Sequence, residues 1–314
     1  MILDAEYPND ARISNECESL IKAGHEIFLF CLSYNKSFIR QEIINQINVR
    51  RYFCSKISYK LSALANDLNL YSNIMFSKIH DFALSNDVEV LHVHDIQIAD
   101  ASLKVARKLQ IKTVLDLHEN RPEIMKDYKH VNSFLGKLLI SSKRWKIAEE
   151  KFVNQSDKVV VTKEAKEEIL TRCDKKNNEI IVYPNTVRQS FYKNKIINQE
   201  IKETYSNDFV MIYIGNTSKR RGLDTVLDSM IRIKKSVNNI KLIILGKSSY
   251  DNELKKKINK LKLDSVVDFI GWVDESDLYK YLLVSDVGVS PLYSNLHHDT
   301  TYACLLYTSD AADE

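Results

Sequence analysis

Short runs of aliphatic residues alternate along the chain with longer segments whose apolar residues recur at every third or fourth position. In the first half this pattern predicts strands at residues 2–4, 26–32, 88–94, 113–117, 158–161 and 180–183. It predicts helices at 11–23, which Gly24 ends, and at 98–109. Repeated strand–helix units indicate an α/β fold with parallel sheets and helices on both faces.

The second half repeats the scheme more regularly. Strands are predicted at 209–214, 242–245, 266–270 and 287–289, and helices around 223–230, 254–261 and 278–283. A polar stretch separates the two series, as expected between domains. We therefore predict a first domain at 1–192, a linker at 193–207 and a second domain at 208–303.

Composition narrows the class of protein. The 314 residues, 44% hydrophobic and 28% charged, suit a globular chain of about two domains. A net charge of +3 is too small to predict a nucleic-acid partner. No apolar run approaches the ~20 residues that span a bilayer, no leader opens the chain, and the five cysteines are scattered. We therefore expect a cytoplasmic protein.

Ligands of parallel sheets bind beyond the carboxyl ends of the strands. The turn from Gly215 to Gly222 occupies such a position, between a strand and a helix, and carries three consecutive cations. Helix N-termini and arginines both suit phosphate, although a solvated basic helix start is an equally good interpretation. The chain has no GxGxxG after a strand and no P-loop, which argues against a dehydrogenase or an NTPase.

Two acid–histidine pairs end predicted strands of the first half: His94-Asp95 and His118-Glu119. At adjacent strand ends they suit hydrogen bonds to a hydroxyl-rich ligand, or proton transfer. The alternative is that each histidine pairs with a neighbouring acid or carbonyl. The histidines lack metal-ligand spacing on one element, so we predict no metal. Asp10 is positioned to cap the helix that follows it.

Residues 134–152 form a basic amphipathic segment that contains Trp145. Such a segment can lie on an anionic membrane surface. We favour the alternative that it is a packing helix of the first domain with a solvated basic face.

Taken together, the motifs resemble those of the retaining glycosyltransferases of family 4, also called group 1 glycosyltransferases. The resemblance covers the chain to about Ala303, and the shared order of motifs that are weak individually makes it strong. The segments that carry it are Pro8-Asn9-Asp10-Ala11-Arg12, Ala23-Gly24-His25-Glu26, His92-Val93-His94-Asp95, Asp116-Leu117-His118-Glu119, Pro184-Asn185-Thr186-Val187, Arg221-Gly222-Leu223-Asp224, Phe269-Ile270-Gly271-Trp272-Val273 and Ser285-Asp286-Val287-Gly288.

The resemblance implies the GT-B fold: two Rossmann-like parallel-sheet domains facing a cleft, with the donor nucleotide-sugar held mainly by the second and the acceptor by the first. It implies that His118 touches the donor sugar near the reacting carbon, that Arg221 holds the diphosphate and that Gly215 lets the phosphates approach. The backbone around Gly271 and Val273 would border the base. The other implied residues are Asn216, Lys219, Arg220, Gly222 and Thr300 for the donor and Asp10, Arg12, His94, Asp95 and Glu119 for the acceptor and cleft.

The sequence departs from the family pattern at two places. Asn216 stands where the family often has an arginine, and we expect Arg220 or Lys219 to replace that cation. The family's paired glutamates are missing from their expected place near Thr300. Residues 304–314 resemble the translation of a sequencing-library adapter. We therefore expect an artefactual tail, an incomplete second domain and little transferase activity from the chain as written.

For the intact protein the resemblance implies transfer of a sugar from a nucleoside-diphosphate-sugar to a hydroxyl of a sugar, lipid-linked or other acceptor, with retention of configuration. We expect this in cell-surface polysaccharide or glycolipid synthesis, without metal or cofactor, in the cytoplasm or at the inner face of the membrane. Two alternatives stay open: a nucleotide-sugar epimerase of the same fold, and a non-catalytic remnant.

Overall fold

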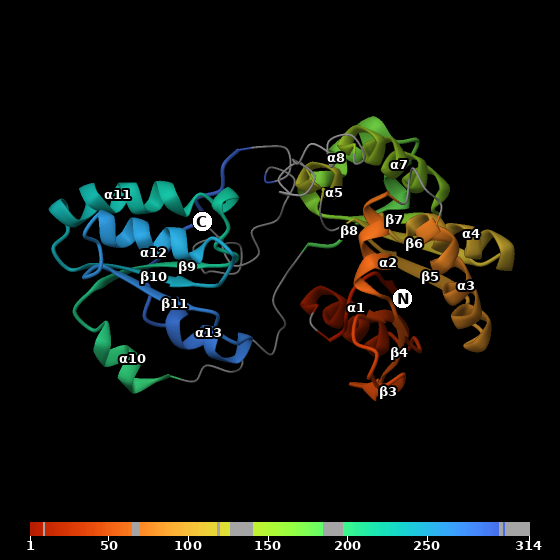
Figure 1. Ribbon diagram of the computed structural model, residues 1–314, viewed down its shortest axis with the longest axis horizontal. Coiled ribbons are helices and arrows are strands. Elements are labelled where there is room, and N and C mark those ends of the chain that lie inside the picture. The colour runs from red at the N-terminus through yellow and green to blue at the C-terminus, as the bar shows by residue number, and fades with distance from the viewer. Residues whose placement is uncertain are drawn as a thin grey trace. The chain divides into compact units, whose positions relative to one another are not determined.

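The computed structural model describes residues 1–8, 10–64, 70–117, 120–125, 141–184, 197–294 and 298. These residues form two compact units: unit 1 contains the described residues up to 184, and unit 2 those from 197 onward. Figure 1 colours both along the chain, and each unit is treated below by itself.

Unit 1 is a helix-covered parallel sheet. Its strands are β1 (Ile2–Leu3), β2 (Phe28–Ser33), β3 (Gln41–Ile44), β4 (Ile47–Phe53), β5 (Val90–His94), β6 (Lys112–Leu117), β7 (Lys158–Val161) and β8 (Ile180–Val182). Its helices are α1 (Ala11–Lys22), α2 (Lys56–Lys60), α3 (Leu70–Ser85), α4 (Ala99–Leu109), α5 (Arg121–Ile124), α7 (Ser142–Gln155) and α8 (Lys163–Arg172), with 3-10 turns η1 (Leu61–Leu64) and η3 (Asn177–Glu179).

The described strands of unit 1 form one eight-stranded sheet in the order β3-β4-β2-β1-β5-β6-β7-β8. The sheet is parallel except for the pair β3–β4, which a two-residue turn connects. That turn, Asn45–Gln46, has φ values of 50° and 65°, as a tight hairpin requires. The short strand β1 lies between β2 and β5 and is parallel to both. The residues that follow β1 therefore lie at the carboxyl edge of the sheet, near its middle.

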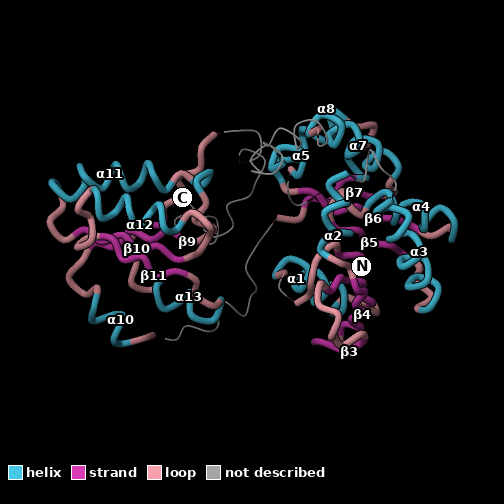
Figure 2. The backbone as a smooth tube through the Cα atoms, viewed as in Figure 1, coloured by secondary structure: helices cyan, strands magenta, loops and turns pink. Residues whose placement is uncertain are grey.

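Helices cover both faces of this sheet, as Figure 2 shows by secondary structure. On β2, Leu29 and Cys31 pack with Ile13 and Cys17 of α1. The alternate residues of the strand point to the opposite face, where α3, α4 and α7 supply the larger core. Because successive side chains of a strand point to opposite faces, the sheet contributes to two hydrophobic cores, one on each face.

Unit 2 repeats the architecture at a smaller scale. Its strands are β9 (Phe209–Ile214), β10 (Ile240–Leu245), β11 (Val267–Gly271) and β12 (Val287–Gly288), and its helices are α10 (Gln199–Thr204), α11 (Leu223–Ser236), α12 (Asp251–Lys260) and α13 (Glu275–Leu282), with the 3-10 turn η4 (Lys219–Arg221). The described strands form a parallel sheet in the order β11-β10-β9-β12.

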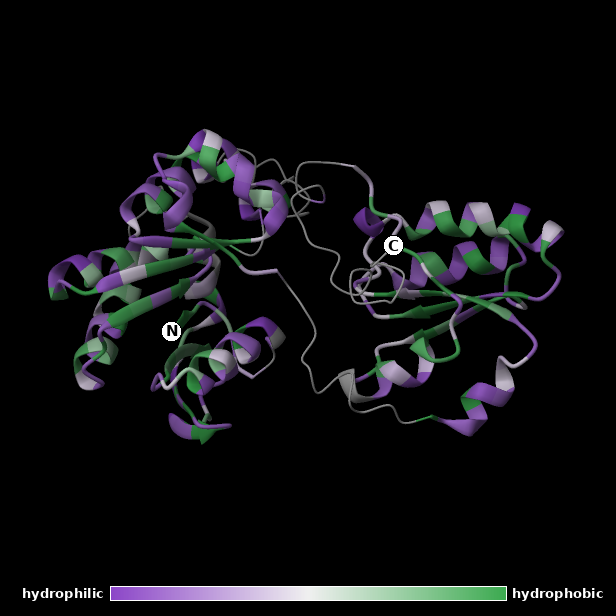
Figure 3. Cartoon of the chain, turned by 180° about the vertical axis from the view of Figure 1, so that it is seen from behind, coloured by the Kyte–Doolittle hydropathy of each residue, from purple (hydrophilic) through white to green (hydrophobic). Residues whose placement is uncertain are grey.

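The faces of this second sheet are again both covered. Helices α11 and α12 pack through Leu227, Met230 and Leu254 on one side. Helices α10 and α13 pack against Val210 and Ile212 on the other. Figure 3 shows the resulting pattern, in which hydrophobic strands lie between helices with hydrophilic outer surfaces.

Within the described part of segment 134–152, the helix that contains Trp145 packs against the core of unit 1. Trp145 is 1% exposed, and Ala148 and Phe152 on the same face of α7 are also buried. Lys146 pairs with Glu168 of α8, and Arg172 pairs with Glu149. The expectation of a packing helix is therefore confirmed for Ser142–Gln155. Within the described residues, no helix is both long and apolar enough to cross a membrane.

Candidate functional site

The first turn of α1 is fixed by a side-chain cap. Asp10 is the N-cap residue, and its Oδ1 accepts hydrogen bonds from the backbone N–H of Arg12 at 2.9 Å and of Ile13 at 3.2 Å. A capping carboxylate satisfies donors that have no partner inside the helix. The predicted capping role of Asp10 is thus confirmed, and the cap sets the direction in which Arg12 leaves the helix.

The side chain of Arg12 makes ion pairs and hydrogen bonds within unit 1. Its Nε and Nη2 donate to both carboxylate oxygens of Asp116, at 3.0 and 2.9 Å, and its Nη1 donates to the carbonyl oxygen of Tyr183 at 3.1 Å. Nε also lies 2.9 Å from Glu16 Oε1, one helical turn along α1. The residue is only 8% exposed. A bidentate pair of this kind is strong and directional, so Arg12 joins α1 to β6.

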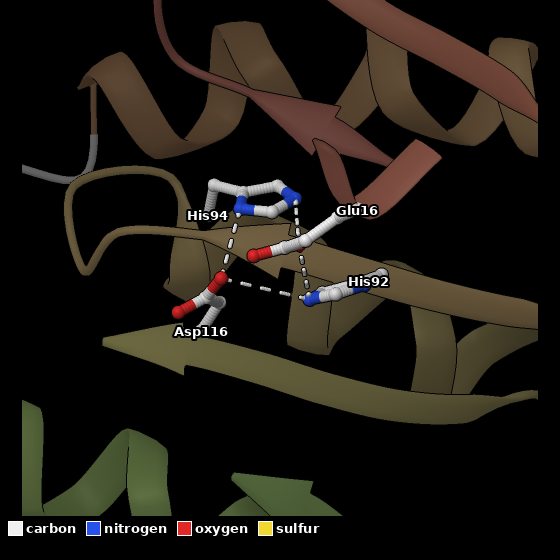
Figure 4. A group of neighbouring side chains, drawn as sticks. All are labelled: Glu16, His92, His94 and Asp116. Atoms are coloured by element: carbon white, nitrogen blue, oxygen red, sulfur yellow. Dashed lines mark ion pairs between the residues drawn. The ribbon is translucent and has the colours of Figure 1, made fainter. Parts of the chain in front are cut away.

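Two histidines of β5 complete an ionic cluster, which we define as Arg12, Glu16, His92, His94 and Asp116. Figure 4 draws the side chains of this cluster other than Arg12. His92 and His94 lie two residues apart on one strand, so they share a face, and their rings stack with centroids 4.5 Å apart. The register pairs His94 with Asp116 on β6, where His94 Nδ1 lies 3.3 Å from Asp116 Oδ2. Three elements thus bring four titratable groups together around one arginine.

Burial controls the protonation of this cluster. Desolvation, followed by the charge of Asp116, raises the pKa of Glu16 to about 10. Desolvation and the neighbouring His94 hold the pKa of His92 well below its usual value. Both shifts have the direction that burial gives, because the charged forms of Glu16 and His92 are disfavoured in the interior.

A second buried group lies beyond β1 and β5. Asp95 follows β5 with a φ of 70° and accepts a hydrogen bond from Arg121 Nη2 at 2.9 Å. Asp4 follows β1 and accepts a hydrogen bond from the Tyr71 hydroxyl. Desolvation raises the pKa of Asp4 to about 7, against the opposing hydrogen bond from Tyr71. A carboxyl group that titrates near neutral pH at the end of a central strand can donate or accept a proton.

In unit 2 the ends of β9 and β10 approach so closely that only glycine fits. Gly215 and Gly246 have φ values of 148° and 138°. A Cβ atom on Gly246 would lie 1.8 Å from the carbonyl oxygen of Gly215. Asn216 then forms a local turn, because its Oδ1 accepts a hydrogen bond from the backbone N–H of Ser218 at 2.9 Å. The turn after β9 is thus defined by its backbone.

Gly222 connects the basic turn η4 to α11. It has a φ of 78°, and a Cβ atom there would lie 1.8 Å from the carbonyl oxygen of Pro291. It is also the N-cap residue of α11 and offers no capping side chain. The N-cap residue therefore offers no side-chain acceptor to the first backbone N–H groups of this 14-residue helix, and such groups attract anions.

The three cations of the turn differ in exposure. Lys219 is exposed, whereas Arg220 and Arg221 are half-buried. Nη1 of Arg220 is buried and has no hydrogen-bond partner among the residues that the structure describes. The positive charges of both arginines lower the pKa of the Tyr213 hydroxyl, against the larger effect of burial, which raises it. Tyr213 is near the end of β9, so these charges lie at the carboxyl end of the sheet. A buried guanidinium donor without a partner favours binding of an anion.

The residues expected to border the base follow β11. Gly271 has a φ of 91°, and no heavy atom lies within 4 Å of a Cβ built on it. Val273 packs into the face covered by α13. Between them Trp272 is 65% exposed, with Lys247 Nζ 5.1 Å from its ring centroid. The strand end thus offers open backbone beside a large aromatic side chain.

Several candidate residues lie outside the described part of the chain. His118, Glu119 and Thr300 are among them, so their predicted roles stay predictions. Conversely, Glu16, Arg121 and Asp4 were not singled out from the sequence. The only local signal for Glu16 is its i, i+4 spacing from Arg12, and that spacing usually marks a surface pair.

The comparison with known families agrees with this geometry. Residues 12–191 match the description "Glycosyltransferase Family 4", and residues 194–298 match "Glycosyl transferases group 1". The first match alone covers more than half of the chain. The chain belongs to glycosyltransferase family 4. Its fold is accordingly the GT-B type, and the predicted fold class is confirmed.

Among curated relatives of this family 4 chain are two proteins named alpha-monoglucosyldiacylglycerol synthase. The one from Streptococcus pneumoniae is 21% identical over 302 residues, which cover 92% of this chain and 65% of the relative. The one from Acholeplasma laidlawii is 24% identical over 213 residues, which cover 64% of this chain and 52% of the relative. The chain therefore spans about half to two thirds of the length of these relatives.

Solved structures share the fold at low sequence identity. Sucrose-phosphate synthase from Thermosynechococcus elongatus superposes with a TM-score of 0.71 at 14% identity, covering 94% of this chain and 75% of that one. Anabaena HepE in complex with UDP superposes with a TM-score of 0.64 at 13% identity, covering 93% and 74%. The family 4 chain thus has the fold of these structures.

Proposed function

We propose that the intact protein transfers a sugar from a nucleoside diphosphate to a hydroxyl acceptor with retention of anomeric configuration. The observation that carries the proposal is the turn of unit 2 between Gly215 and Gly222. There, within the described residues, a helix that begins after an N-cap glycine and a buried donor of Arg220 without a hydrogen-bond partner occur together at the carboxyl end of the sheet. Membership of family 4 and the UDP held by the HepE structure support the same donor class.

In the proposed reaction, negative charge develops on the leaving diphosphate. The backbone N–H groups at the start of α11 and the Arg220 and Arg221 side chains would stabilise that charge electrostatically. Gly215 would let the phosphates approach the backbone, because any side chain there would require a strained φ. The backbone N–H groups are held in place by α11, so they would need little reorganisation when the donor binds. This step needs no metal at the diphosphate.

For the acceptor we propose a membrane glycolipid or diacylglycerol. The support is that two relatives are named as synthases of a glucosylated diacylglycerol. We assign the acceptor to unit 1, where Asp4 and Asp95 lie at strand ends and could orient a hydroxyl. A lipid acceptor would place the protein in the cytoplasm, at the periphery of the membrane.

The test is glycosyl transfer by the intact protein. It would be given UDP-, GDP- and ADP-linked glucose and galactose, with vesicles that contain diacylglycerol or monoglucosyldiacylglycerol. We expect acceptor-dependent release of one nucleoside diphosphate and a product whose anomeric proton coupling matches the donor. An inverted anomer would contradict retention. Epimerisation of the donor without acceptor would contradict transfer.

A further inference from the structure

The ionic cluster of unit 1 contains a set of donors typical of metal sites. Glu16 comes from α1, His92 and His94 from β5, and Asp116 from β6. One ligand atom from each of these four residues lies within 4.8 Å of the other three. Figure 4 shows the carboxylate oxygens and imidazole nitrogens directed toward one another. His92 and His94 share one face of β5, and the other two donors come from α1 and β6.

Three of the four separations between imidazole nitrogens and carboxylate oxygens in the cluster exceed hydrogen-bond distance, and the fourth, from His94 Nδ1 to Asp116 Oδ2, is 3.3 Å. His92 Nε2 lies 3.6 Å from Glu16 Oε2 and 3.9 Å from Asp116 Oδ2, and His94 Nε2 lies 3.8 Å from Glu16 Oε2. Pairs at such distances are too far apart for hydrogen bonds. Bonds of about 2.0 to 2.1 Å to a tetrahedral ion put its ligands roughly 3.3 to 3.4 Å apart. Metal binding would therefore draw these side chains slightly inward.

Two of the converging atoms are buried without a hydrogen-bond partner among the described residues. They are Oε2 of Glu16, whose side chain is 6% exposed, and Nε2 of His92. Leaving a buried polar atom without a partner costs free energy that a bound ion would recover. This observation is independent of the composition of the cluster and points to a ligand between the two side chains.

Charge also favours a cation. The cluster contains two carboxyl groups, and Arg12 supplies a single positive charge to them. Arg12 holds Asp116 from one side through two hydrogen bonds, as residues behind metal ligands commonly do. A divalent ion would provide the charge that both carboxylates need when ionised.

We propose that Glu16, His92, His94 and Asp116 bind one divalent first-row transition-metal ion, with Zn²⁺ as the best chemical match. Two imidazoles and two carboxylates suit Zn²⁺ and its neighbours in the series rather than Mg²⁺ or Ca²⁺. Four protein ligands in a buried place leave no position for substrate, so the site is structural. It would hold α1 against β5 and β6, and it is independent of the donor turn in unit 2.

The experiment uses the untagged chain, stripped with chelator and then titrated with Zn²⁺ by calorimetry and with Co²⁺ by absorption spectroscopy. The test variants are Glu16→Gln, which keeps the shape of a protonated carboxyl group, and His92→Gln. The matched control is His80→Gln. His80 of α3 has a side chain as buried as that of His92, 17% against 15% exposed, and its Nδ1 lies 3.8 Å from one carboxylate, Asp81. Circular dichroism checks that each variant folds.

We expect one Zn²⁺ per chain, bound at micromolar or tighter dissociation constant, and visible Co²⁺ bands typical of four-coordinate nitrogen and oxygen ligation. Either test variant should weaken binding by at least roughly 100-fold, whereas His80→Gln should bind like the wild type. The proposal is wrong if the wild type shows no saturable binding, or if both test variants bind as the control does. Thiolate-to-cobalt charge-transfer bands would assign the ion to cysteines instead and would also overturn it.

Discussion

Near the carboxyl ends of its strands, unit 1 buries Arg12 between the carboxylates of Asp116 and Glu16, whereas unit 2 presents Arg220 without an ion pair among the described residues. In the first arrangement the protein itself supplies the partners of the guanidinium. In the second, within the described part of the chain, a guanidinium donor has no hydrogen-bond partner and the helix that follows has a glycine as its N-cap. Similar sheets thus use the same residue type in two ways: an arginine paired inside the fold stabilises structure, and one without a partner is available to an anionic ligand.

The largest expected effect breaks the paired arrangement. Asp116→Ala leaves the Arg12 charge buried without its bidentate partner, and such changes cost about 3–5 kcal/mol. Urea unfolding in chelator would measure the loss. Trp145 is buried in unit 1, so a Trp272→Phe background makes it the sole tryptophan reporter. A change below about 1 kcal/mol would show that the ion pair contributes little to the stability of unit 1.

The strands and helices of the two units could be predicted from the sequence only in part. Strands β7 and β9 lie where the aliphatic runs predicted them, and α1 begins at the residue after its predicted cap. No element was predicted between residues 33 and 87, although the Asn45–Gln46 turn separates two short strands there. Helix α3 was missed because its apolar residues do not keep to one face: buried Met75 and Phe82 accompany exposed Leu70 and Ile74.

The site was harder to predict than the fold because its residues meet through sheet order. Arg12 and Asp116 are 104 positions apart, and they meet because β1 lies beside β5 and β5 beside β6. Nothing in local spacing reveals that order. The basic turn of unit 2 was easier to find, because its glycines and cations are contiguous and follow a strand directly. The ligand chemistry that we propose for it therefore rests on eight consecutive residues.

A second prediction uses pH to test whether ionisation of the buried Asp4 lowers the free energy of unfolding. The pKa of Asp4 is about 7 in the folded protein and 3.8 as its ordinary value. Between these values the folded state binds more protons than the unfolded state, so the contribution of Asp4 to stability falls as pH rises. Asp4→Asn should remove this loss and stabilise the protein at pH 8 by up to about 4 kcal/mol.

The measurement is the difference in unfolding free energy between Asp4→Asn and the wild type at pH 4, 6 and 8. It should grow across the series. A difference that is constant with pH would mean that Asp4 is ionised throughout the folded state.

A third prediction compares a glycine from each unit. Gly24 and Gly222 have φ values of 90° and 78°, but only Gly222 has a backbone atom in the place of a Cβ. Gly24→Ala should cost about 1 kcal/mol, the strain of the backbone conformation alone. Gly222→Ala should cost roughly 1–3 kcal/mol more, because the loop around Pro291 must move. Equal losses in thermal unfolding would show that the loop yields without cost.

The central claim is that the turn of unit 2 binds the diphosphate of the donor, and calorimetric titration with UDP tests it most directly. The comparison is between wild type, Arg220→Gln and Arg232→Gln, because Arg232 is an exposed arginine of the same helix region away from the turn. We predict that Arg220→Gln weakens UDP binding by roughly 10- to 100-fold, the value of a charge-assisted hydrogen bond, and that Arg232→Gln leaves it unchanged. Equal affinity of all three proteins for UDP would contradict the claim.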